Sequence, residues 1–232
     1  MSKPLAVVVG IGPGNGEALA RRFSKAGYQL ALLSRSTDLS SKLAAELGDA
    51  RAIACDAGDP ASVERAFEEV RTLGTVETLL YNAGSGAWGS VEDITPQEFE
   101  NNWRVNALGT LTSAQQVVGP MKAAGKGNIV LIGATASRRG AAGTAAFAPA
   151  KAAQRSLAES MAKHLGPAGI HVALIIIDGV VDLPRTRKRM PDKPSDFFVK
   201  PDAVAETAFQ LTRQDRSAWS FEVEARPFGE KW

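Results

Sequence analysis

Phe147 and Lys151 are the residues of this chain whose types and spacing bear most directly on chemistry. On a helix, a ring and an amine four residues apart lie on the same face and point into the same cleft. A hydroxyl on such a ring could donate a proton to a carbonyl group while the lysine lowers the pKa of that hydroxyl. Phe147 carries no hydroxyl, so the pair predicts a reaction site that lacks its general acid.

Glycines follow the first apolar run of the chain as Gly10, Gly14 and Gly16, with Asn15 between the last two. Glycine permits a tight turn between a strand and a helix, and it lets a phosphate approach the backbone N–H groups at the helix N-terminus. The spacing alone is a weak signal. A second turn, Asn82-Ala83-Gly84, follows a later apolar run, and open α/β sheets bind ligands at the carboxyl ends of their strands. Together the two turns predict a dinucleotide site.

The end of the second expected strand distinguishes NAD(H) from NADP(H). An acidic residue there would hydrogen-bond the ribose hydroxyls and repel a 2′-phosphate. The chain has Leu33-Ser34-Arg35-Ser36 instead, and the guanidinium of Arg35 could hold that phosphate. NADP(H) is therefore favoured over NAD(H). The alternative is that Arg35 is a solvated loop cation.

Apolar runs rich in β-branched residues alternate with longer helical patterns along the chain. Near-continuous runs suit strands buried on both faces, and their alternation with helices implies right-handed crossovers and a parallel sheet covered on both sides. Strands are expected at Leu5–Gly10, Tyr28–Ser34, Arg51–Cys55, Thr78–Tyr81, Asn128–Ile132, His171–Ile177 and Ala218–Val223, and helices near 15–26, 38–47, 60–73, 96–123, 149–165 and 202–213. No linker interrupts this pattern, so residues 1–232 are predicted to form one doubly wound α/β domain with about seven parallel strands.

Composition excludes several classes of function. A net charge of +2 argues against a nucleic-acid-binding face, although a pI of 8.7 leaves room for a local basic patch. The single Cys55 cannot form an internal disulfide, and no cysteine–histidine spacing suggests a metal. The chain opens without a signal-peptide pattern, and no apolar stretch reaches the roughly 20 residues that span a bilayer. We expect a soluble, cytoplasmic protein without membrane partners.

Several separated motifs resemble the short-chain dehydrogenase/reductase family, over nearly the whole chain. Val9–Gly16 is similar to the family's Thr-Gly-x-x-x-Gly-x-Gly turn, and Asn82-Ala83-Gly84 is similar to its Asn-Ala-Gly. The resemblance implies a Rossmann-type domain and an NAD(P)(H) cofactor. It also places Asp56 at the position that contacts the adenine; the alternative from the residues is that Asp56 caps a helix or turn.

The family's catalytic tetrad of Asn, Ser, Tyr and Lys is only half present. The chain keeps Asn106 and Lys151, whereas Ala134 stands at the serine position and Phe147 at the tyrosine position. The chain therefore resembles an atypical subgroup in which Phe replaces the tyrosine. The resemblance implies that Lys151 lies near the nicotinamide ribose and that Asn106 kinks its helix and holds a water. The alternatives are a surface cation and a purely structural kink.

No other residue is an evident substitute for the missing acid. Tyr28 is expected at the wrong end of the sheet and Tyr81 in a buried strand, and both histidines are expected to be structural. The hydroxyls of Thr135 and Ser137 could donate a hydrogen bond to a substrate, but their pKa values are too high for an unaided general acid.

The region after the sixth expected strand departs from the family. Asp178-Gly179 replaces its Pro-Gly and Leu183 replaces a threonine near the carboxamide, which puts that contact in doubt. The cations of Pro184–Met190 fall in the family's substrate-covering loop and could recruit an anionic substrate; a solvated mobile loop is the alternative. The C-terminal segment Phe221–Phe228 is similar to the one through which relatives associate, so a homodimer or homotetramer is expected.

Two functions are compatible with these residues. The first is an atypical NADP(H)-dependent oxidoreductase that transfers hydride to or from an unidentified small molecule without the usual Tyr and Ser. The retained Asn106 and Lys151 favour it. The second is a catalytically inactive NADP(H)-binding sensor or oligomer partner, which Phe147 and Ala134 favour.

Overall fold

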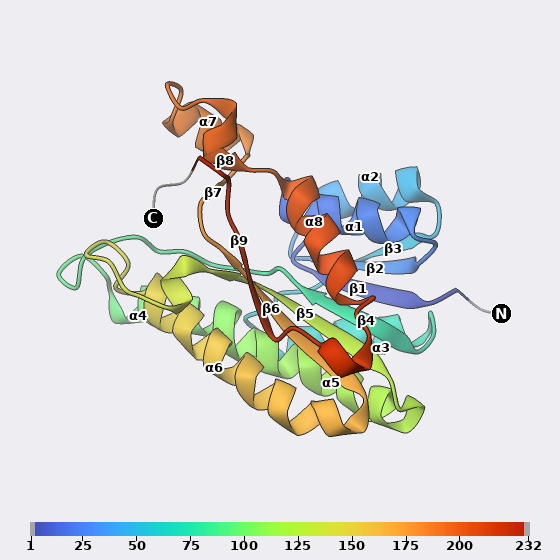
Figure 1. Ribbon diagram of the computed structural model, residues 1–232. Coiled ribbons are helices and arrows are strands. Elements are labelled where there is room, and N and C mark those ends of the chain that lie inside the picture. Colours follow the sequence, from blue (N-terminus) through green and yellow to red (C-terminus); the bar gives the residue numbers. More distant parts are fainter. Residues whose placement is uncertain (1–2, 230–232) are drawn as a thin grey trace.

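A computed structural model describes residues 3–229 of the chain and contains a seven-stranded parallel sheet with helices on both faces (Figure 1). The strand order is β3-β2-β1-β4-β5-β6-β9, and every neighbouring pair is parallel. The strands are β1 (Leu5–Val9), β2 (Gln29–Ser34), β3 (Ala50–Ala54), β4 (Val76–Tyr81), β5 (Gly127–Ala134), β6 (Ile170–Ile177) and β9 (Glu222–Ala225). The predicted fold class is confirmed.

The apolar runs form the centre of the sheet because both of its faces are covered. All five residues of β1 and all eight of β6 are buried. Side chains of alternate residues enter two separate hydrophobic cores, one on each face. A strand with two buried faces cannot alternate apolar and polar residues, which is why the runs are continuous.

Three helices cover each face of the sheet (Figure 1). One core receives side chains from α1 (Asn15–Lys25), α2 (Asp38–Leu47) and α8 (Pro201–Leu211). The other receives side chains from α3 (Pro60–Arg71), α5 (Gly109–Ala124) and α6 (Phe147–Leu165). In the described part of the chain, no helix is long and apolar enough to cross a membrane.

The predicted helix over 96–123 consists of three segments. It comprises α4 (Pro96–Trp103), a π-helical segment (Arg104–Leu108) and α5, which continues to Ala124. Thr95 caps the N-terminus of α4 in a capping box with Glu98, and Asn106 lies in the middle of the π-helical segment. Such an insertion shifts the helix face by one residue and is frequent at functional sites.

The last predicted strand, Ala218–Val223, is wrong by several residues. Residues Arg216–Ala218 form a 3-10 turn, and β9 begins at Glu222. The His171 ring stacks on Trp219 at a centroid distance of 4.8 Å, and its Nε2 lies 2.9 Å from the carbonyl oxygen of Ser220. These side-chain contacts hold residues 219–220 in place of strand pairing.

The loop expected after β6 contains a helix and two strands that the sequence did not predict. It contains α7 (Pro184–Arg189) and a small parallel pair of strands, β7 (Val180–Val181) and β8 (Phe198–Val199). Arg187 pairs with Asp182 at 2.7 Å, and its guanidinium lies 4.1 Å from the ring centroid of Phe198. These contacts tie α7 to β8.

Candidate active site

The glycine turn between β1 and α1 lies against the ends of two neighbouring strands. The N–H groups of Gly10 and Ile11 donate to the carbonyl oxygen of Leu33 at 2.8 and 3.0 Å. The side-chain amide of Asn82 donates to the carbonyl oxygen of Gly10 at 2.7 Å. The carboxyl ends of β1, β2 and β4 are thereby joined at one edge of the sheet, where the sequence predicted a dinucleotide.

Glycine is required at the three predicted positions of this turn. A Cβ on Gly10 would lie 2.4 Å from the backbone nitrogen of Ala83, and one on Gly16 would lie 2.5 Å from the carbonyl oxygen of Gly10. Gly14 has a φ of 105°, and a Cβ there would lie 2.3 Å from Cδ2 of Leu183. The turn therefore presents bare backbone at the N-terminus of α1, where a phosphate can approach N–H groups.

Two further predicted residues border this turn. The Oδ1 atom of Asn15 is buried and accepts no hydrogen bond within residues 3–229. A buried acceptor without a donor can bind a ligand hydroxyl or amide. Arg35 lies two residues beyond Leu33, which contacts the turn, and its side chain is exposed. The bare backbone and the exposed cation fit a dinucleotide phosphate, and the open acceptor of Asn15 fits a hydroxyl of the same ligand.

Asp56 follows β3 and organises its own turn. Its Oδ1 accepts from the N–H of Gly58 at 2.9 Å, and its N–H donates to Oγ of Ser62 at 2.9 Å. These contacts match the turn cap that the sequence analysis left open as an alternative.

Lys151 is buried inside the fold although it is a cation, with 5% of its surface exposed. Its Nζ donates to the carbonyl oxygen of Ile132 at 3.1 Å and to Oε1 of Gln154 at 2.9 Å. Burial lowers the pKa of Lys151 to about 8, because the charged form loses its hydration. The surface-cation alternative is thus wrong, and at neutral pH the amine can both hold and release a proton.

Asn106 and Lys151 meet at Gly84. A Cβ on Gly84 would lie 3.6 Å from Oδ1 of Asn106 and 3.9 Å from Nζ of Lys151. The amide nitrogen of Asn106 donates to the carbonyl oxygens of Ser85 and Asn102, both at 2.9 Å, whereas its buried Oδ1 has no partner in the described chain. The two retained residues therefore face one point, and an open acceptor is available there.

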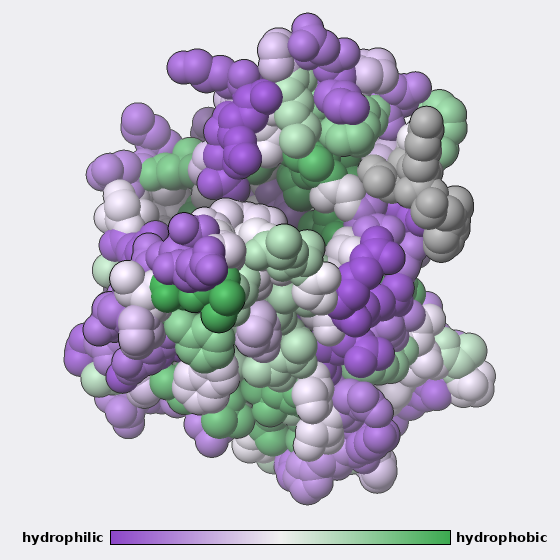
Figure 2. Space-filling model, turned by 90° about the vertical axis from the view of Figure 1, so that its left-hand side faces the viewer, coloured by the Kyte–Doolittle hydropathy of each residue, from purple (hydrophilic) through white to green (hydrophobic). Residues whose placement is uncertain are grey.

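Phe147 begins α6 and forms an aromatic pair with Trp88. The ring centroids are 4.9 Å apart with a tilt of 36°, and 65% of Trp88 is exposed. A Cβ on Gly86 would lie 3.0 Å from Nε1 of Trp88 and 3.7 Å from Cδ2 of Phe147, so glycine leaves room for both rings. Seen from the carboxyl-end side of the sheet, the molecule has a hollow with hydrophobic surface in it and hydrophilic surface around it (Figure 2). Phe147, at the position that could have carried an acid, thus forms an apolar wall together with Trp88.

The hydroxyls beside Ala134 are held by protein groups. Ala134 ends β5 and offers no donor. The hydroxyl of Thr135 contacts the carbonyl oxygen of Ile177 at 3.2 Å and donates to the carboxylate of Asp178. Ser137 donates to the carbonyl oxygen of Ala134 at 2.7 Å. Both hydroxyls already have acceptors, so neither is arranged as a substitute for the absent serine.

Residues 4–193 match the family model for short chain dehydrogenases. The chain belongs to the short-chain dehydrogenase family. A sorbitol dehydrogenase of Cereibacter sphaeroides is 33% identical over 180 residues, which cover 76% of this chain and 70% of that protein. A short-chain dehydrogenase from Rhodopseudomonas palustris has a TM-score of 0.85 at 31% identity, covering 98% of this chain and 100% of the other. An alcohol dehydrogenase from Thermococcus sibiricus in complex with 5-hydroxy-NADP has a TM-score of 0.88 at 25% identity, covering 99% of both chains.

As a short-chain dehydrogenase, the protein is an NAD(P)-dependent oxidoreductase by type.

Neither of its tyrosines reaches the site. The Tyr81 hydroxyl donates to the carbonyl oxygen of Val105 at 2.5 Å, and burial raises its pKa. The Tyr28 hydroxyl lies 3.4 Å from Oε1 of Glu77, and the residue precedes β2 at the amino end of the sheet. His164 lies 3.1 Å from Nζ of Lys122, on the surface.

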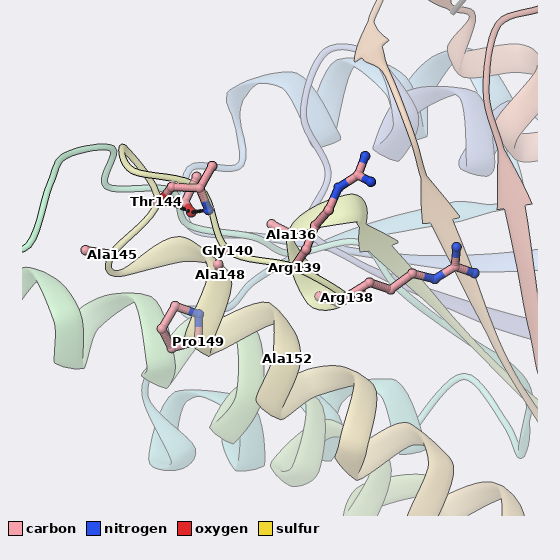
Figure 3. A pocket seen from close by; sticks show the side chains of 11 residues that line it. Ala136, Arg138, Arg139, Gly140, Thr144, Ala145, Ala148, Pro149 and Ala152 are labelled. Atoms are coloured by element: carbon pink, nitrogen blue, oxygen red, sulfur yellow. Dashed lines mark hydrogen bonds between the residues drawn. The ribbon is translucent and has the colours of Figure 1, made fainter. Parts of the chain in front are cut away.

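A separate pocket of about 320 Å³ lies between the loop after β5 and the outer side of α6 (Figure 3). Small side chains such as Ala148 and Ala152 form one wall, and Arg138 and Arg139 extend from the loop. Of the residues considered for the site from the sequence, Ser137 lines this pocket, whereas Asn106, Phe147 and Lys151 do not. Within residues 3–229, no group of three or more His, Cys, Asp or Glu side chains is placed to hold a metal ion.

Three contacts at the site were not predicted. Two of them join segments that are far apart in the sequence, namely the pairing of Trp88 with Phe147 and the packing of Leu183 on Gly14. The third is the hydrogen bond from Lys151 to Gln154, within one helical turn. Only this third contact could have been predicted from the sequence, because two residues that are three positions apart on a helix lie on the same face.

Proposed function

We propose that this short-chain dehydrogenase transfers hydride between NADP(H) and a substrate that needs no proton from position 147. The observation that carries the proposal is that Phe147 stands one helical turn before the buried Lys151, at the only place where the family's ring acid could stand. Ala134 removes the second donor. The cofactor, when bound, supplies or accepts the hydride; the protein's own residues determine which acceptor can use it.

Ordinary ketone reduction is disfavoured by these two residues. Hydride addition to a carbonyl leaves an alkoxide, which needs a proton and hydrogen-bond donors as its charge develops. A positioned general acid contributes roughly 10² to 10⁴ in rate. Phe147 and Ala134 provide neither contribution.

An iminium ion or an activated double bond avoids that requirement. When hydride adds to the carbon of an iminium, the C=N π electrons move to nitrogen and the product is a neutral amine. Addition to an enone leaves a delocalised enolate, which Lys151 or solvent can protonate later. The aromatic pair of Trp88 and Phe147 supports a cationic acceptor, because ring faces attract cations.

The preference for NADP(H) rests on Arg35. It follows β2 with no acid beside it, and its exposed guanidinium lies near a turn that β1 and β2 share through Leu33. A 2′-phosphate there would form charge-assisted hydrogen bonds with it.

An anionic group on the substrate is supported by α7. Arg185, Lys188 and Arg189 are exposed on this short helix, whereas Arg187 is paired with Asp182. Within residues 3–229 these three cations form no ion pair, and a cluster of positive charge raises the local concentration of anions. A cytoplasmic location is part of the same proposal, as is self-association through the edge strand β9, which pairs with β6 on one side only.

The test is substrate-dependent oxidation of NADPH by the purified protein, with a panel of cyclic iminium ions, enones and ketones. Turnover of an iminium or enone in preference to ketones is the expected result. Micromolar cofactor binding without turnover of any member, also after Phe147→Tyr combined with Ala134→Ser, would replace the proposal by the binding-only function.

A further inference from the structure

Gln154 is a polar residue on the inward face of α6, where the buried residues that follow it are apolar. The buried positions of this helix include Lys151, Gln154, Ala158, Met161 and Leu165, at the three- and four-residue spacing of one face. The last three pack in a hydrophobic core, whereas Gln154 has no exposed surface at all. Burying an amide is unfavourable unless both of its ends are hydrogen-bonded.

Both ends of Gln154 have partners, and they lie on two different elements. Its Oε1 accepts from Nζ of Lys151 at 2.9 Å, and its Nε2 donates to Oγ1 of Thr110 at 3.1 Å. Thr110 in turn donates to the carbonyl oxygen of Asn106 at 2.7 Å. A buried chain of hydrogen bonds thus runs from Lys151 on α6, through Gln154, to the first turn of α5 and the π-helical segment.

These hydrogen bonds determine the direction in which the Lys151 amine points. Nζ has three protons, of which one goes to Ile132 and one to Gln154. Those two fixed bonds direct the third toward the point beside Gly84 that Oδ1 of Asn106 also faces. With an apolar residue at position 154, one of the two restraints on the amine would be missing.

We propose that Gln154 is a positioning residue that aims the Lys151 amine at the reaction site and links it to Asn106 through Thr110. The proposal rests on the proposed function, since it assigns Lys151 a part in the reaction. Gln154 itself touches neither substrate nor cofactor, so it acts only through Lys151.

Among the described residues, no charged side chain contributes to the lowered pKa of Lys151. Within residues 3–229 its Nζ pairs with no carboxylate, and burial is the cause of its lowered pKa. The groups that face it are neutral: the carbonyl of Ile132 on β5, the amide of Gln154 on α6 and the amide of Asn106 in the π-helical segment. The hydroxyl of Tyr81 on β4 interacts with Thr110, the next member of the hydrogen-bond network, and this phenol stays protonated because burial raises its pKa. The amide oxygen of Gln154 favours the charged amine, and its loss would favour the neutral one.

The test follows the titration of Lys151 directly by NMR of lysine labelled with ¹³C at Cε and ¹⁵N at Nζ, in the full-length protein without cofactor or substrate. Lys151→Met identifies the resonance by its loss. Gln154→Leu is expected to lower the midpoint by about one pH unit, and Gln154→Glu to raise it by at least as much, because one hydrogen bond to a charged group is removed or strengthened. Ser113→Ala is the control. This serine is buried on α5 and its hydroxyl has no partner in the described chain, so its loss is expected to leave the midpoint unchanged.

Thr110→Val provides a second variant that leaves Lys151 and Gln154 in place. It removes the acceptor of the Gln154 amide, and a shift in the same direction as in Gln154→Leu but smaller is expected. If Gln154→Leu does not fold, Thr110→Val and Gln154→Glu decide the matter. Midpoints equal to that of the wild type in all folded variants would overturn the proposal.

The readout is independent of the proposed function. If no substrate is ever turned over but the midpoints shift as described, the proposed function fails while the positioning of the amine stands. Once a substrate is known, the alkaline limb of the kcat–pH profile is expected to move with the NMR midpoint, with KM changing less than kcat.

Discussion

The proposed function rests on two side chains, Phe147 and Ala134, that differ from the tetrad implied by the family resemblance. Phe147 and Ala134 occupy the places of a proton donor and a hydrogen-bond donor, whereas Lys151 and Asn106 stay in contact with the same point beside Gly84. Lys151 and Asn106 are buried and hydrogen-bonded, and burying such polar groups costs free energy. That cost is understandable if the amine and the amide still act on a bound molecule.

Arg35→Asp tests the cofactor preference at the same scale. The substitution removes a cation and adds an acid beside the ribose position, so it repels a 2′-phosphate and accepts from ribose hydroxyls. NADPH affinity is expected to fall at least about 10-fold, and NADH affinity to hold or rise, since one charge-assisted contact is worth about 1.5–3 kcal/mol. Calorimetric titration measures both. Equal losses for the two cofactors would remove Arg35 from the site.

Lys151 also predicts a dependence of stability on pH. Its folded pKa of about 8 lies below the unfolded value of 10.5, so the unfolded chain binds the proton more tightly between these values. Protonation therefore destabilises the fold fully below pH 8, and this penalty disappears as pH rises through 10.5. The free energy of unfolding of the wild type, relative to that of Lys151→Met, is expected to rise by up to about 3 kcal/mol between pH 8 and 10.5. Urea unfolding at several pH values measures this; a constant difference would show that the amine is not desolvated.

At the scale of elements, the site depends on where strands end. Continuous apolar runs marked six of the seven main strands to within about two residues at each end, because a strand buried on both faces leaves a clear hydrophobic record. The seventh failed because His171 and Trp219 hold residues 219–220 by side-chain contacts. The resemblance placed a helix kink at Asn106, where the π-helical segment lies. The helix α7 escaped prediction, since contacts of Arg187 with Asp182 and Phe198 stabilise it.

The candidate site was predictable to a similar degree. The glycines, Asn82 and Lys151 follow from spacing and converge as predicted. The apolar wall formed by Trp88 and Phe147 could not be predicted in this way, because the two rings are far apart in the sequence.

Gly10→Ala tests the turn that joins these strand ends. The added Cβ would lie 2.4 Å from the backbone nitrogen of Ala83, at a φ of 96°. Backbone cannot move aside as a flexible side chain can, so a loss of about 3 kcal/mol or more in the free energy of unfolding is expected, together with loss of cofactor binding. Gly140→Ala is the matched control, because nothing lies within 4 Å of its Cβ. Thermal unfolding and NADPH titration compare the two; similar behaviour would contradict the required close approach.

For the whole molecule, the edge strand β9 and the acidic residues within it predict self-association. Glu222 pairs with Arg138 and Arg155, so the charges near this edge are neutralised within the chain. An edge with paired charges and unpaired backbone groups can associate with a second copy. Sedimentation at micromolar concentration is expected to give a dimer or tetramer, and a monomer would contradict this.

The most direct measurement is kcat/KM for NADPH-dependent reduction of a cyclic iminium ion and of the ketone of matched ring size. The wild type is expected to favour the iminium at least about 10²-fold, because a missing general acid penalises only the ketone. In Phe147→Tyr combined with Ala134→Ser, that ratio should fall by at least about 10-fold as ketone reduction recovers. Equal kcat/KM values of the wild type for the ketone and the iminium would contradict the proposed hydride transfer without a general acid.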